Sequence, residues 1–216
     1  MWHVYATSAK LQPSWPARCS AILPARVSRA VEVLADRPGP AYLRLKRGEV
    51  PEIFDDNHRL DLDRAQWLTA EGPADACIMA AGMMVPTALA AARALGDNGL
   101  SVAVLNVPVI KPLDAATVVA AAQQSRLVVT AENHTVVGGL GSAVAEALAE
   151  AGCARALRRI GIADVFAESG SREFLFDRYG LSTQHIVDTV WRTLGINRPA
   201  PGVATVESAP GEYAPV

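Results

Sequence analysis

The stretch Thr130-Ala-Glu-Asn-His-Thr-Val-Val-Gly-Gly-Leu-Gly-Ser-Ala-Val-Ala-Glu146 decides the fold of this 216-residue chain. It predicts the end of an apolar strand at 127–131, a polar corner at 132–134, a glycine turn, and a helix over 141–151. This order is typical of parallel α/β sheets, which usually bind ligands at the carboxyl ends of their strands. The polar residues Glu132, Asn133 and His134 therefore lie where such a sheet has its functional edge.

The chain around this stretch repeats the same alternation of strand and helix. Apolar runs and helical spacing predict strands over 76–81, 101–107 and 154–162, and helices over 86–95, 114–124, 171–179 and 182–194. Strands that alternate with helices favour an α/β fold with a mostly parallel sheet and helices on both faces. We place this domain at residues 73–195.

The flanking regions have a different character. Residues 1–20 show no regular period, whereas 25–36 predict a helix and 41–45 a strand, so that 21–48 form a helix–strand unit. The polar, Asp-rich stretch 49–72 is expected to be an interdomain linker. Residues 196–216 are expected to be a disordered tail because of their proline content.

Composition excludes several classes of function. Half of the residues are hydrophobic and the net charge is −2, with no basic stripe that would indicate nucleic acid or an anionic membrane. The apolar runs are shorter than the ~20 residues of a membrane span. Three distant cysteines without a CxxC pair favour a reducing cytoplasm over a disulfide framework.

Five segments in order resemble the C-terminal domain of the transketolase family. They are 80–92, Val104-Leu-Asn-Val-Pro-Val-Ile-Lys-Pro-Leu-Asp114, the glycine stretch 132–146, Arg159-Ile-Gly-Ile162, and Glu168-Ser-Gly170 followed by Tyr179-Gly-Leu-Ser182. Residues 39–51 resemble the last strand of the preceding pyrimidine-binding domain, so 21–48 would be a remnant of it. The resemblance covers about 24–194 and is nearest to the separate C-terminal subunit of two-chain transketolases; 2-oxoacid dehydrogenase E1 β subunits and deoxyxylulose-phosphate synthase share the domain.

The resemblance implies transfer of a two-carbon ketol unit between sugar phosphates, with thiamine diphosphate and Mg²⁺ in the complete enzyme. It also implies a cytoplasmic enzyme of carbohydrate metabolism, the pentose phosphate reactions included. The expected partners are an N-terminal transketolase subunit, a second copy in a dimer, or both. The family's Gly-Asp-Gly motif has no counterpart here, because the similar string Gly96-Asp-Asn-Gly99 ends a predicted helix. The glutamate of the family's pyrimidine-binding domain has no counterpart either, because 21–48 would be only a remnant of that domain. We therefore expect no catalytic residue, metal or cofactor on this chain alone, and an assembly module without activity remains the alternative.

The glycine turn and the polar corner each allow two interpretations. Gly138, Gly139 and Gly141 could cradle a phosphate at a helix N-terminus, but the full spacing of such loops is missing, which favours close approach to another backbone or subunit. Glu132 and His134 could be a general base with its orienting carboxylate; the favoured interpretation is a hydrogen-bonded pair that fixes the corner. Their expected role is to support the active-site wall or a subunit contact.

Arg47 is the candidate for binding substrate. It follows the predicted strand 41–45, and a guanidinium at a strand end can bind phosphate through paired hydrogen bonds. The spacing of Leu45-Lys-Arg-Gly-Glu-Val-Pro51 matches the family stretch whose arginine contacts the sugar phosphate. An ion pair with Glu49 or Asp55 is the competing interpretation.

Overall fold

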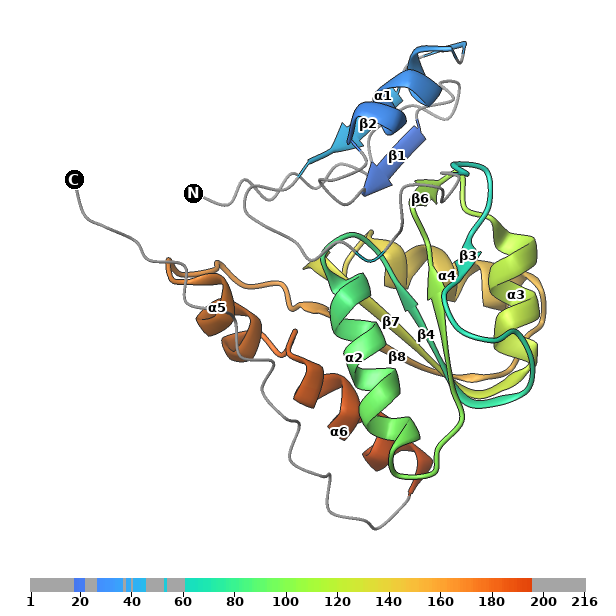
Figure 1. The fold of residues 1–216 in the computed structure, drawn as a ribbon, viewed down its shortest axis with the longest axis vertical. Coiled ribbons are helices and arrows are strands. Elements are labelled where there is room, and N and C mark those ends of the chain that lie inside the picture. The colour runs from blue at the N-terminus through green and yellow to red at the C-terminus, as the bar shows by residue number, and fades with distance from the viewer. Residues whose placement is uncertain are drawn as a thin grey trace.

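The structure is a computed structural model that describes residues 18–21, 27–36, 38–39, 41–45, 53 and 61–195. Its main body is a five-stranded sheet of order β3-β5-β4-β7-β8 (Figure 1). Strands β5, β4, β7 and β8 are parallel to one another, and the short edge strand β3 is antiparallel to β5. The strands are β3 (Gln66–Trp67), β4 (Ala74–Ala80), β5 (Val102–Asn106), β7 (Ser125–Thr135) and β8 (Ala156–Ile162).

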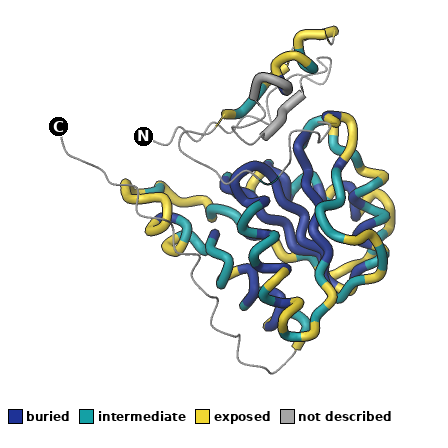
Figure 2. Tube along the Cα trace, in the orientation of Figure 1, coloured by how far each residue is buried: buried dark blue, intermediate teal, exposed yellow. Residues whose placement is uncertain are grey.

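Helices cover both faces of this sheet. Helices α2 (Met84–Gly96) and α6 (Thr183–Leu194) pack on one face, and α3 (Ala115–Gln123) and α4 (Leu140–Glu150) pack on the other. Alternate residues of β4 serve the two cores: Ile78 belongs to the α2–α6 side and Met79 to the α3–α4 side, both without exposure. The central strands are therefore buried on both faces, as Figure 2 shows.

A second, three-stranded sheet has the order β2-β1-β6 and includes both strands of the described N-terminal residues. Strand β1 (Arg18–Ala21) pairs in parallel with β2 (Ala41–Arg44), and helix α1 (Val27–Ala35) connects them along the chain. The third strand, β6 (Val109–Lys111), comes from the main domain and is antiparallel to β1. The predicted helix–strand unit is thus joined to the main domain through β6.

The α/β prediction, with its mostly parallel sheet and helices on both faces, is confirmed, but three strands lie where none was expected. β3 lies within the stretch 49–72 that was expected to be a linker, and Leu62 and Ala65 beside it are buried. β1 begins inside 1–20, and β6 follows β5 after two residues. These strands have two to four residues, too few to show an alternating pattern. Most of 49–60 and all of the expected tail 196–216 lie outside the described residues.

Strand β7 is longer than its sequence indicates. After Ala131 its register to β8 shifts, and pairing resumes between Thr135 and Ile162. Glu132, Asn133 and His134 are therefore part of the strand, where the sequence analysis expected a corner after it. Their polar side chains hid the strand because apolar alternation stops at Ala131.

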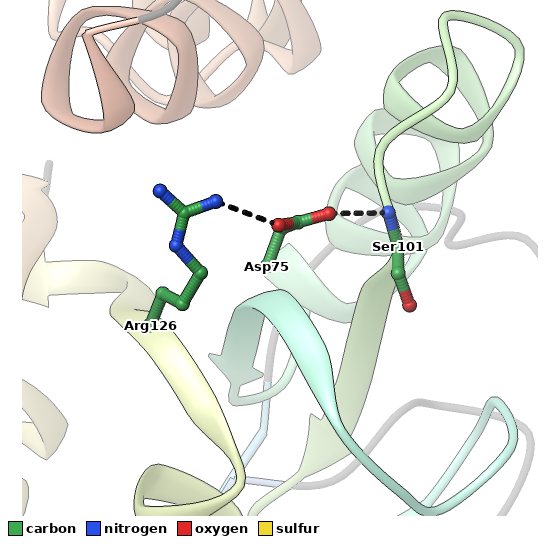
Figure 3. A network of polar contacts seen from close by, with 3 residues as sticks. All are labelled: Asp75, Ser101 and Arg126. Carbon is green, nitrogen blue, oxygen red and sulfur yellow. Dashed lines mark hydrogen bonds and ion pairs between the residues drawn. The ribbon is translucent and has the colours of Figure 1, made fainter.

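The amino ends of the strands carry their own polar network (Figure 3). The Asp75 carboxylate accepts a hydrogen bond from the Ser101 backbone N–H at 3.0 Å and pairs with the Arg126 guanidinium at 2.9 Å. This network ties β4 to the starts of β5 and β7. It lies at the end of the sheet opposite to Glu132 and His134.

Candidate functional site

A buried carboxylate is the centre of the candidate site. Glu132 is 2 % exposed, and each of its carboxylate oxygens accepts a backbone N–H at the start of α4. The Leu140 N–H donates to Oε2 and the Gly141 N–H donates to Oε1, both at 2.8 Å. Gly139 is the N-cap of α4 and makes no side-chain cap hydrogen bond. Glu132 therefore supplies, from the preceding strand, the capping acceptor that the helix lacks locally.

Three glycines leave the space that this carboxylate and its strand occupy. A Cβ atom on Gly139 would lie 2.7 Å from the Cδ of Glu132, and one on Gly161 would lie 3.2 Å from its Cγ. A Cβ atom on Gly141 would lie 2.9 Å from the Thr130 hydroxyl oxygen. The close approach predicted for the glycine turn thus occurs within the chain, between α4 and strands β7 and β8.

The turn between β7 and α4 is fixed by contacts of its own. The Ser142 hydroxyl accepts the Gly138 N–H at 2.9 Å and donates to the Val136 carbonyl at 3.1 Å. The Arg159 guanidinium donates to the same carbonyl at 3.0 Å. Gly138 adopts a φ of 72°, a left-handed conformation that other residues rarely take.

Burial dominates the protonation of Glu132. Removal from water raises the pKa of its carboxyl group from 4.5 to about 7, against the opposing effect of the Gly141 and Leu140 N–H groups and of Arg44 and Arg159. The positive end of the α4 dipole faces this carboxylate. The two N–H groups that an external phosphate would use at this helix start are already bonded to Glu132. The geometry therefore gives no support to a phosphate-binding glycine loop.

The His134 side chain makes its contacts in a different part of the structure from Glu132. Its Nδ1 lies 3.0 Å from the Thr135 carbonyl oxygen, which can only accept, so this contact places the proton on Nδ1. The ring lines an open pocket at the carboxyl ends of β7 and β8, together with residues of the β8–α5 loop and of α5 (Arg172–Arg178). The oxygens of Glu132 accept the N–H groups at the start of α4 instead, so these contacts do not support the base-and-carboxylate pair of Glu132 and His134.

Arg47, the predicted phosphate ligand, lies outside the described residues. Its neighbour Arg44, at the end of β2, reaches the pocket, and its Nη2 donates to the Asn133 carbonyl at 3.3 Å. Sequence reasoning did not single out Arg44, Thr130, Arg159 or Gly161. Of these, only Gly161 carried a signal, because a glycine inside a strand pattern indicates close backbone approach.

The sheet with helices on both faces and the glycine turn before α4 place this chain in the class of parallel α/β proteins. Comparison with known proteins then gives its family. Residues 65–186 match the family model "Transketolase, C-terminal domain". The chain therefore belongs to the transketolase family and corresponds to its C-terminal domain. The matched range begins before β3, in agreement with the place of that strand in the main sheet.

Three similar proteins define the relationship more closely. The transketolase family protein y4mN of Sinorhizobium fredii (strain NBRC 101917 / NGR234) is 46 % identical over 74 % of this chain and 47 % of its own length. The 6-deoxy-6-sulfo-D-fructose transketolase subunit SqwH of Clostridium sp. (strain MSTE9) is 40 % identical over 76 % of this chain and 50 % of its own. The chain thus spans about half the length of the curated relatives it matches.

A solved structure, "Split gene transketolase, inactive beta4 tetramer", shares the fold with a TM-score of 0.77. It is 37 % identical, and the match covers 85 % of this chain and 59 % of that one. Within the described residues, no helix has both the length and the apolar character to cross a membrane.

The described residues do not fit thiamine diphosphate and its Mg²⁺. The string Gly96-Asp-Asn-Gly99 closes α2: Asp97 is the C-cap, the Asn98 side chain donates to the Ala94 carbonyl at 2.9 Å, and Gly99 has a φ of 81°. The predicted turn is confirmed, and its polar groups serve the helix end. Within the described ranges there is no cluster of three or more His, Cys, Asp or Glu side chains that could hold a metal ion.

Replacing Glu132 with Gln should change how stability depends on pH. The pKa of Glu132 is about 7 when folded and 4.5 when unfolded, so its contribution is fully present below pH 4.5 and is lost as the pH rises through 7. Gln does not titrate and can accept only one of the two N–H groups. The unfolding free energy of wild type minus that of Glu132→Gln should therefore fall from pH 5 to pH 8, by on the order of 3 kcal/mol.

Urea unfolding at several pH values measures this gap. Glu146→Gln, the same change on the exposed face of α4, is the matched control for loss of a carboxylate from this helix. A gap for Glu132→Gln that does not change with pH would mean that Glu132 titrates alike in the folded and unfolded chain.

Proposed function

We propose that this chain is the C-terminal part or subunit of a thiamine-diphosphate-dependent transketolase, which transfers a two-carbon ketol unit between sugar phosphates. The observation that carries this proposal is the match to relatives of twice the matched length, one of them named as a transketolase subunit. The reaction belongs to carbohydrate metabolism, the pentose phosphate reactions being the nearest family example, and we place it in the cytoplasm. The sugar itself stays undefined.

The coenzyme would be bound elsewhere in the complete enzyme. The pyrimidine-binding and diphosphate-binding parts would come from the rest of the protein or from an N-terminal subunit, because the described residues here form no such site. The coenzyme supplies the electron sink for the ketol carbanion. This chain would supply subunit contacts, part of the active-site wall, and Arg47 toward the substrate phosphate.

Exposed apolar side chains support an assembly role. Val137 in the glycine turn is 64 % exposed and Phe166 in the β8–α5 loop is fully exposed. Exposed large apolar side chains favour contact with another protein. The 37 % identical relative is described as an inactive β₄ tetramer, which favours self-association of this chain and inactivity without its partner. A non-catalytic assembly module is therefore the second candidate function.

Reconstitution separates the two candidates. The isolated chain should bind no thiamine diphosphate at micromolar concentration, because its described residues lack a diphosphate site. Calorimetry with Mg²⁺ and coenzyme measures this directly. Mixed with an N-terminal transketolase subunit from the same source, the chain should give ketol transfer that neither part shows alone. An N-terminal subunit that is equally active without this chain would favour the assembly module.

Arg47→Ala should raise KM for phosphorylated sugars in the reconstituted enzyme and leave unphosphorylated sugars nearly unaffected. Loss of a hydrogen bond to a charged group costs ~1.5–3 kcal/mol, or roughly a ten- to hundredfold change. Arg126→Ala, at the opposite end of the sheet, is the control. Equal losses on both kinds of sugar would assign Arg47 to a structural ion pair with Glu49 or Asp55.

Val137→Ser combined with Phe166→Ser should weaken self-association or capture of the N-terminal subunit, because both changes remove exposed apolar surface without touching the core. Val31→Ser, on the exposed face of α1, is the control. Gly139→Val is unsuitable as an interface probe because its side chain would collide with Glu132. Light scattering reports the mass, and an unchanged mass and unchanged capture in the double variant would exclude this surface.

A further inference from the structure

The Thr130 side chain is a buried hydroxyl group without a hydrogen bond. It lies in the middle of β7 with an exposure of 0 %. Among the residues that the structure describes, only the Thr130 hydroxyl oxygen and the Trp191 indole nitrogen are buried side-chain polar atoms that have no partner. Because a buried hydroxyl without a hydrogen bond costs free energy, such groups are rare in folded proteins and call for an explanation.

This hydroxyl lies beside the carboxylate that caps α4, since both face Gly141. A Cβ atom on Gly141 would lie 2.9 Å from the Thr130 hydroxyl oxygen, and the Gly141 N–H donates to Oε1 of Glu132 at 2.8 Å. Thr130 and Glu132 are two residues apart on β7, and alternate residues of a strand share a face. The unpaired hydroxyl is therefore on the Oε1 side of the carboxylate, whereas Oε2 accepts the Leu140 N–H.

The present contacts of Glu132 fit only its ionised form. An ionised carboxylate only accepts hydrogen bonds, so both of its oxygens can take an N–H group, but a protonated carboxyl group has one oxygen that must donate. Burial favours the protonated form and raises the pKa of Glu132 to about 7, so that both forms are populated near neutral pH. Uptake of the proton therefore breaks one of the two N–H bonds and requires a buried acceptor for the new O–H group.

The charged groups near Glu132 do not supply this acceptor. Among the described residues, Arg44 of β2 and Arg159 of β8 are the charged groups that lower its pKa, and a guanidinium group has no acceptor. Helix α4 presents N–H donors. His134, the next titratable side chain on β7, places Nδ1 3.0 Å from the Thr135 carbonyl oxygen. The unpaired hydroxyl of β7 is thus the acceptor on the Oε1 side.

We propose that Glu132 and Thr130 form a proton-dependent switch at the start of α4. In the ionised form Glu132 accepts the N–H groups of Leu140 and Gly141. In the protonated form the carboxyl group turns, its Oε1–H donates to the Thr130 hydroxyl oxygen, and the bond from Gly141 is lost while that from Leu140 stays. The turn that bears the exposed Val137 joins this carboxyl group to α4, so it depends on the same proton. The proposal does not depend on ketol transfer.

Amide hydrogen exchange of the wild-type chain tests the switch without a substitution. Protection factors compare each amide with the unfolded chain at the same pH, which removes the intrinsic pH dependence of exchange. The protection of Gly141 should fall roughly three- to tenfold relative to that of Leu140 between pH 8 and pH 5, because only the Gly141 bond is lost. A constant ratio between these two neighbouring amides would overturn the proposal.

Substitutions at Thr130 assign the acceptor. Thr130→Val keeps the shape of the side chain and removes the hydroxyl group, so only the protonated form of Glu132 loses a hydrogen bond. The titration midpoint of Glu132, followed by carbon-13 NMR, should therefore fall by about 0.5 to 1 pH unit. Less polar surroundings alone would raise the midpoint, which makes the direction of the shift decisive.

Thr130→Ser is the matched control, because it keeps the hydroxyl group and should keep the wild-type midpoint. A thermal melt verifies that both variants fold. An unchanged or raised midpoint in Thr130→Val would overturn the proposal and place the proton on another acceptor, such as the Thr135 carbonyl oxygen. A midpoint in Thr130→Ser that falls as far as in Thr130→Val would overturn it too, because the shift would then come from altered packing.

Discussion

The Glu132 carboxylate, 2.8 Å from the amide nitrogens of both Leu140 and Gly141, joins the end of β7 to the start of α4. A buried carboxylate without partners would cost several kcal/mol, and a helix start without a cap would leave unpaired N–H groups. Each group satisfies the other. The glycines at 139 and 161 follow from this pairing, because a side chain at either would meet Glu132, whereas one at Gly141 would meet Arg159 and Thr130.

This pairing divides the carboxyl edge of the sheet into two parts. On the α4 side, the helix N-terminus is occupied by the chain's own anion, so the glycine turn is structural. Toward α5, His134 and Arg44 line an open pocket that also has apolar walls. Beside β8 and α5, the edge where parallel sheets usually bind ligands forms an open pocket.

Sequence reasoning predicted the α/β fold, most helices and strands, and the close approach at the glycine turn. It succeeded where periodicity is long, as in α4 and α6, and where a cap is local, as at Asp114, whose side chain accepts the Thr117 N–H. It missed β1, β3 and β6 because two to four residues carry no period. It also separated Glu132 from its partners, since a carboxylate that caps a helix eight residues away leaves no local signature. Arg44 was missed because its place in the pocket depends on the packing of β2 against the main domain.

A carbon-13 NMR titration of the Glu132 side-chain carboxyl tests the central claim most directly. If this carboxylate is buried against the start of α4, its pKa is about 7, and the Leu140 and Gly141 amide shifts change with the same midpoint. The account predicts these coincident midpoints. Leu140 and Gly141 amide shifts that do not follow the Glu132 titration, whatever its midpoint, would contradict the pairing on which the glycine turn is argued to depend.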